Sequence, residues 1–127
     1  MRRSGILHPE LSLHLARLGH TDSFVIGDCG LPIPPGVARV DLAVTFGVPG
    51  FAEVADAILA EIETDSAVIA EEAAGSAAGQ VLAERFADAA TVPHEDFKQL
   101  IQQARFAVRT GDTTPYSNVL VRCGVPF

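Results

Sequence analysis

Short apolar runs alternate along this chain with segments in which apolar residues recur at helical spacing. The apolar runs cover residues 23–28, 37–46, 66–70 and 119–123, and they are typical of strands. The segments at helical spacing cover residues 10–18, 51–61, 75–90 and 93–104. Residues 91–92 favour a short extended piece, and residues 106–109 favour either a strand or a continuation of the preceding helix. This alternation predicts an α/β fold in which helices cover a largely parallel or mixed sheet.

The size and composition of the chain fit one folded domain. Hydrophobic residues make up 48% of the 127 residues and charged residues 20%, a balance that excludes a disordered chain. We therefore expect a single domain over residues 1–127. No apolar run approaches the roughly 18 residues of a membrane span, and charged residues interrupt the place of a signal peptide's apolar region. We expect a cytoplasmic protein.

Charge and motif content narrow the classes of partner and cofactor. The chain has 9 basic and 16 acidic residues, a net charge of −7, and no basic stripe. Such a chain is a poor candidate for binding nucleic acid or an anionic membrane, and we expect neither as a partner. No P-loop, dinucleotide-binding glycine pattern or zinc-ligand spacing is present, so we expect no cofactor and no metal. Cys29 and Cys123 form no C-x-x-C pair, and we expect two buried free thiols.

Asp28 is the acidic residue that stands out. It ends an apolar run, and a loop stiffened by three prolines follows it over residues 29–36. Ligands of open α/β sheets bind beyond the carboxyl ends of the strands. Asp28 could therefore anchor a hydroxylated ligand, accept a proton, or only cap a helix or lie in solvent. Glu71 and Glu72 follow the apolar run 66–70 and are interpreted as acids at a helix start.

Two of the four histidines are candidates for chemistry. His20 follows Gly19 at a helix end and either terminates the helix or performs acid–base catalysis. His94 begins a helix, and Lys98 lies one turn further on the same face. The other two, His8 and His14, are interpreted as surface or interface residues.

A polar turn precedes the last strand. Its side chains offer donors and acceptors suited to a polyol, although a plain turn uses the same residue types. The residues are Tyr116, Ser117 and Asn118.

Several segments, in order along nearly the whole chain, resemble the ribose pyranase/fucose mutarotase family. The most specific segments are Leu18–Asp22 and Asp28–Pro34. Further similar segments are Arg39–Ala43, Ile69–Glu72, His94–Lys98, Arg109–Gly111, Pro115–Asn118 and Cys123–Phe127. The fucose branch of the family is less similar, because its loop after the aspartate differs.

The resemblance implies a three-layer α/β/α fold assembled as a ring-like homodecamer with sites shared between neighbouring subunits. It implies a cofactor-free isomerase that converts β-D-ribopyranose into β-D-ribofuranose for ribose catabolism. In this family pattern His20 matches the catalytic histidine. The positions that match substrate-binding residues are Asp28, His94, Lys98, Tyr116, Ser117 and Asn118.

Three other functions remain open from the residues. One is a fucose-type sugar mutarotase. Another is a non-catalytic sugar-binding accessory protein of ribose uptake, which would need Asp28, Tyr116 and Asn118 but not His20. The third is a metal-dependent hydrolase built from His20, Asp28 and His94.

Overall fold

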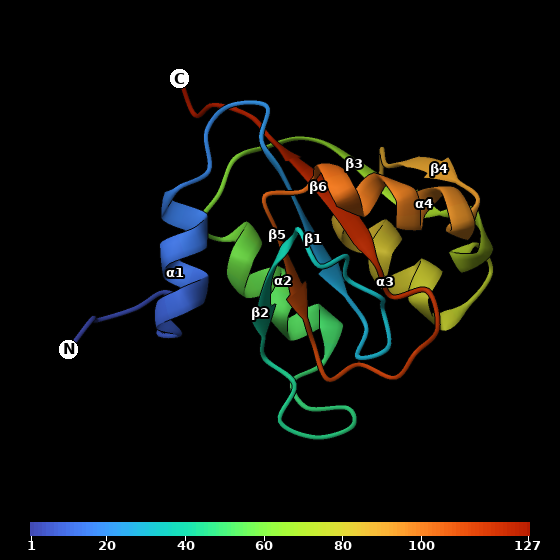
Figure 1. The fold of residues 1–127 in the computed structure, drawn as a ribbon, viewed down its shortest axis with the longest axis horizontal. Coiled ribbons are helices and arrows are strands. Elements are labelled where there is room, and N and C mark those ends of the chain that lie inside the picture. The colour runs from blue at the N-terminus through green and yellow to red at the C-terminus, as the bar shows by residue number, and fades with distance from the viewer.

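A six-stranded sheet forms the centre of the computed structural model, which describes residues 1–127 (Figure 1). The strands are β1 (Ser23–Gly27), β2 (Ala38–Asp41), β3 (Thr64–Ala70), β4 (Ala90–Val92), β5 (Phe106–Arg109) and β6 (Val119–Cys123). The helices are α1 (Pro9–Ala16), α2 (Phe51–Leu59), α3 (Ala77–Arg85) and α4 (His94–Leu100), with the 3₁₀ turns η1 (Glu71–Ala73) and η2 (Ile101–Gln103).

The sheet is mixed and mostly parallel, which confirms the predicted fold class. Its strand order is β2-β5-β1-β6-β3-β4. β6 runs antiparallel to both of its neighbours, β1 and β3, whereas the three other pairings are parallel. The segment 106–109, for which the sequence left helix and strand open, is the strand β5 between β1 and β2.

Two hydrophobic cores lie on opposite faces of the sheet. Phe24 and Ile26 of β1 pack into the larger core with apolar residues of α1, α2 and α3. Val25 points the other way, because side chains alternate along a strand, and packs with Phe97 of α4 and with Ile101. These cores produce three layers, with α4 and η2 covering the second face. No helix is both long and apolar enough to span a membrane.

The strand predicted over residues 37–46 is wrong in its second half, because β2 ends at Asp41. Residues 42–50 leave the sheet edge and form a loop held by the backbone, in which the Gly111 N–H donates to the Pro49 carbonyl at 2.8 Å. Val44 and Phe46 are 81% and 83% exposed on this loop. The apolar side chains that suggested a half-buried strand therefore form an exposed apolar surface beside the edge strand β2.

The helix predicted over residues 75–90 is shorter in the structure. α3 starts after Ser76, whose hydroxyl accepts a hydrogen bond from the Gly79 N–H at 3.2 Å. It ends at Phe86, which leaves the helical conformation (φ −133°) and places its ring in the larger core. Burial of this ring outweighs the helical preference of the alanines that follow.

Gly79 is required by a close approach of two backbone segments. A Cβ at this position would overlap the carbonyl oxygen of Ala73 in the preceding 3₁₀ turn, and a carbonyl cannot move aside as a flexible side chain can. We therefore expect Gly79→Ala to lower the free energy of unfolding by about 2 kcal/mol in urea titrations. Helix propensity alone predicts the opposite, a gain of about 1 kcal/mol, so a stabilised variant would contradict this account.

Candidate functional site

Asp28 and Asn118 are joined by two hydrogen bonds, although 90 residues separate them in sequence. The Oδ1 atom of Asn118 accepts a hydrogen bond from the Asp28 backbone N–H at 2.9 Å. Its Nδ2 atom donates to Oδ2 of Asp28, also at 2.9 Å, and the Gly30 N–H donates to Oδ1 of Asp28 at 2.8 Å. Asn118 is fully buried. Its amide therefore orients the carboxylate of Asp28, whose oxygens keep free lone pairs for a ligand.

Gly27, the last residue of β1, leaves room for this pair. A Cβ at Gly27 would lie 3.0 Å from Oδ1 of Asn118 and 2.5 Å from Cδ2 of Leu31. A larger residue at this position would therefore press on the Asn118 amide and displace the Leu31 side chain at the end of β1.

Tyr116 and His94 meet next to this pair. The Asn118 N–H donates to the Tyr116 carbonyl at 2.8 Å, and Tyr116 has a left-handed backbone conformation with φ at 66°. The Tyr116 ring meets the His94 ring edge to face, with centroids 5.2 Å apart. Ser117 is buried between Tyr116 and Asn118. The polar turn is thus folded back on the first residue of α4.

Lys98 lies on α4 one turn after His94, as the spacing predicted. Its ammonium forms an ion pair with Glu95 at 2.6 Å, and this contact holds the pKa of the Glu95 carboxyl below its usual range. We use the name sheet-edge cluster for the five residues Asp28, His94, Tyr116, Ser117 and Asn118. Lys98 is connected to them only by its place on α4, because its ammonium pairs with Glu95.

His20 is not part of the sheet-edge cluster. It is exposed in the turn that enters β1 from the opposite end, where the Thr21 N–H donates to the Cys123 carbonyl at 3.1 Å. The blue segment leading into β1 lies beside the C-terminus of the chain (Figure 1). His20 borders a hollow of about 450 Å³ there, together with Leu18 and Phe127. The four steps of β1 alone span about 13 Å, so one chain does not bring His20 to Asp28.

Asp22 fixes the turn that carries His20. Its Oδ2 atom accepts from the Gly19 N–H at 2.9 Å, and its Oδ1 atom accepts from Nε of Arg105 at 2.8 Å. The bond from Gly19, followed by that from Arg105, holds the pKa of Asp22 below its usual range. The exposed imidazole of His20 is therefore presented from an ordered turn.

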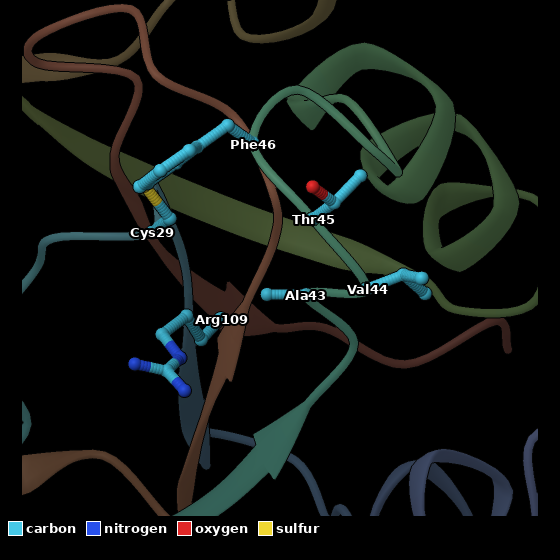
Figure 2. Close-up of a pocket in the computed structure, with 6 residues that line it drawn as sticks. All are labelled: Cys29, Ala43, Val44, Thr45, Phe46 and Arg109. Atoms are coloured by element: carbon cyan, nitrogen blue, oxygen red, sulfur yellow. The ribbon is translucent and has the colours of Figure 1, made fainter.

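A second hollow lies at the carboxyl ends of β1, β2 and β5, where it is lined by Cys29, the residue after Asp28 (Figure 2). It measures about 260 Å³ and is lined by Cys29, Arg109 and the exposed loop that carries Phe46. The Arg109 guanidinium forms an ion pair with Asp41. The expectation of two buried thiols is wrong for Cys29, which is half-buried at this hollow.

The remaining two histidines and Cys123 are engaged in capping, stacking or burial within the fold. His8 caps α1, because its Nδ1 atom accepts from the Leu11 N–H at 3.2 Å, and His14 stacks on Phe106. Burial raises the pKa of the Cys123 thiol. No three His, Cys, Asp or Glu side chains lie close enough together to hold a metal ion.

Asp112 connects α2 to the loop between β5 and β6 that carries the polar turn. The sequence did not predict this contact. Its carboxylate accepts from the Phe51 N–H at 2.9 Å and from the Thr114 N–H at 2.8 Å. Burial raises the pKa of Asp112, but these bonds outweigh it, so the pKa lies below the usual 3.8. The only signal in the sequence was an acidic residue shortly before the polar turn.

We expect Asp112→Ala to lower the free energy of unfolding by about 1–2 kcal/mol at neutral pH. A depressed folded-state pKa stabilises the fold above the unfolded-state value, and that contribution is lost as the pH falls. The stability gap between wild type and variant should therefore narrow below pH 3.8, as measured by urea titration at several pH values. A gap that widens in acid would contradict this role.

Asn118→Ala should leave the Asp28 N–H without its acceptor and the carboxylate free to rotate. We expect a loss of about 1–3 kcal/mol in the free energy of unfolding, measured in urea. Ser117→Ala is the control, because Ser117 is also buried, with 4% exposure, but its hydroxyl forms no hydrogen bond within the chain. Equal losses in the two variants would show that the Asn118 amide does not stabilise this end of the sheet.

Known proteins are similar to this chain over its full length. A model of the RbsD / FucU transport protein family matches residues 1–126. A Cutibacterium acnes protein named D-ribose pyranase is 54% identical over 127 residues, which cover 100% of both chains. The structure of Bacillus subtilis RbsD complexed with D-ribose has a TM-score of 0.93 at 37% identity, and 100% of both chains is covered.

A more distant structure shares the fold. The fucose mutarotase from Streptococcus pneumoniae, solved in complex with L-fucose, has a TM-score of 0.81 at 20% identity, with 95% of each chain covered. This likeness concerns the fold alone, whereas the family model and the relative from Cutibacterium acnes cover the sequence itself. The chain belongs to the RbsD / FucU transport protein family.

Proposed function

We propose that this chain is a D-ribose pyranase, an isomerase that interconverts β-D-ribopyranose and β-D-ribofuranose. The observation that carries the proposal is the sheet-edge cluster, in which a buried amide orients a carboxylate beside two rings, in a chain of this family. The 54% identity to a protein named D-ribose pyranase supports the same sugar. We infer that residues 1–127 act as one cytoplasmic domain that supplies the furanose for ribose catabolism.

The proposed reaction needs proton transfer and no redox step. A base removes the proton from the anomeric hydroxyl while an acid protonates the ring oxygen, and the hemiacetal opens to an aldehyde and a free C5 hydroxyl. The C4 hydroxyl then attacks the aldehyde carbon and loses its proton, and the carbonyl oxygen gains one. Atoms and electrons balance without an added reactant, so side chains that bind and exchange protons suffice.

Each candidate residue has a role that its chemistry allows. His20 carries the proton, since imidazole takes up and releases protons near neutral pH. Asp28 accepts hydrogen bonds from sugar hydroxyls, and His94 and Lys98 bind further oxygens. Tyr116 orients the sugar while its chain is open. Ser117 and Asn118 form the turn that supports Tyr116.

We propose that two copies of the chain complete one site. His20 lies at the opposite end of β1 from Asp28, so the His20 end of one copy has to meet the sheet-edge cluster of the next. A head-to-tail contact of this kind forms a ring when its rotation closes, which fits a ring-like homodecamer. The exposed side chains of Val44, Phe46 and Val48, at the same end of the sheet as Asp28, supply apolar surface for such a contact.

Exchange NMR on D-ribose tests the activity. Wild type should speed pyranose–furanose exchange, whereas His20→Ala and Asp28→Asn should each reduce the rate by roughly 100-fold or more. A folded His20→Ala assembly with the wild-type rate would contradict the role of His20. Binding of D-ribose without faster exchange in wild type would favour the accessory sugar-binding protein, and faster exchange of L-fucose than of D-ribose would favour the fucose mutarotase.

Co-expression of the two inactive variants tests whether the site is shared. If His20 and Asp28 come from different copies, about one quarter of the sites in randomly mixed assemblies carry both wild-type residues. Exchange activity should then return to about that fraction of the wild-type rate. If both residues belong to the same chain, every site in the mixture lacks one of them and no activity returns.

A further inference from the structure

Glu72 contacts the first residue of α4 from η1, the 3₁₀ turn that follows β3, and lies 22 residues earlier in the chain. Its carboxylate oxygens accept from the His94 backbone N–H at 2.8 Å and 3.0 Å. Pro93, which precedes α4, offers no side-chain acceptor for the free N–H groups of the helix. Glu72 therefore supplies the acceptor that the local sequence lacks and ties His94 to the central sheet.

The His94 ring is confined on several sides. It lies parallel to the ring of Phe97, with centroids 6.3 Å apart, and edge to face with Tyr116. Phe97 is fully buried, so it fixes the position of this face of the imidazole. With the backbone of His94 held by Glu72 and the ring held by these contacts, the imidazole has little freedom to turn.

The two ring nitrogens of His94 have different surroundings. Nδ1 is buried and has no hydrogen-bond partner. Nε2 also has no hydrogen-bond partner within the chain, but it is accessible. A proton on Nδ1 would bury a donor without an acceptor, which costs free energy. A proton on Nε2 instead places the donor at the nitrogen that a ligand can reach.

We propose that Glu72 is a positioning residue, which holds His94 so that Nε2–H donates a hydrogen bond to a sugar oxygen in the sheet-edge cluster. The identity of the ligand rests on the proposed function, whereas the geometry of Glu72 and His94 does not. In this arrangement His94 binds the sugar and is not the proton carrier. An imidazolium at this position would leave its Nδ1–H without a partner. The proton transfer is left to His20, whose ring is exposed.

Glu72→Ala removes the acceptor and should shift the ring signals of His94 in long-range ¹H–¹⁵N spectra of the ligand-free protein. It should also raise KM for D-ribose roughly two- to tenfold, the value of one hydrogen bond, with kcat within about twofold of wild type. Glu72→Gln keeps an acceptor oxygen and should lie between wild type and Glu72→Ala. Glu71→Ala is the matched control, because Glu71 is an exposed neighbour with no side-chain hydrogen bond, and it should match wild type.

A merely structural role of Glu72 would change the amount of folded enzyme and therefore the apparent kcat, but not KM or the His94 spectrum of the folded fraction. Glu72→Ala with the KM and ring signals of Glu71→Ala would overturn the proposal. If wild type neither binds nor isomerises D-ribose, the proposed function fails. The ring signals measured without sugar still decide whether Glu72 positions His94.

A pair of His94 variants tests which nitrogen donates. The amide nitrogen of Gln reaches the place of Nε2, and that of Asn reaches the place of Nδ1. His94→Gln should therefore keep KM within about threefold of wild type, whereas His94→Asn should raise it by roughly tenfold. The reverse order would overturn the assignment of Nε2 as the donor, and so would long-range ¹H–¹⁵N spectra of wild type with the proton on Nδ1.

Discussion

The antiparallel pairing of β1 with β6 determines where the candidate residues at both ends of β1 lie. Its register pairs Ile26 with Val119 and Ser23 with Arg122. One end of this ladder therefore places Asp28 against Asn118, and the other places the turn of His20 beside the C-terminal segment of the chain. A shift of one residue would turn the side chains of β6 to the wrong faces and separate the Asn118 amide from the Asp28 carboxylate.

The sequence predicted the parts of the site that depend on local pattern. Asp28 lies directly after a buried strand, and His94 and Lys98 share a face of α4, as their spacing required. The bonds between Asn118 and Asp28 could not be predicted from the residues, because they depend on a strand pairing 90 residues apart in sequence. For Glu72 the sequence indicates only an acid at a helix start, since nothing in it relates Glu72 to a helix 22 residues later.

The errors in the predicted elements have physical causes that a periodic pattern does not contain. The alternation beyond Asp41 predicted a strand, but Val44 and Phe46 both face solvent on a loop anchored by Gly111. An apolar surface of this kind fits the proposed assembly, in which another copy would cover it. In α3, the end of the helix follows from burial of the Phe86 ring, which depends on the larger core and not on local propensity.

The two halves of the candidate site differ in how they are held. Asp28 and His94 are fixed by Asn118 and Glu72, so a sugar would meet carboxylate and imidazole groups that are already oriented. His20 stands on an exposed turn, and one chain alone gives it none of these partners. If the catalytic proton carrier reaches the sugar only across a contact between copies, then a single chain can bind the sugar, but only the assembly can catalyse the reaction. Activity per chain would then fall upon dilution, because separate copies keep the sheet-edge cluster and lose the histidine that acts on it.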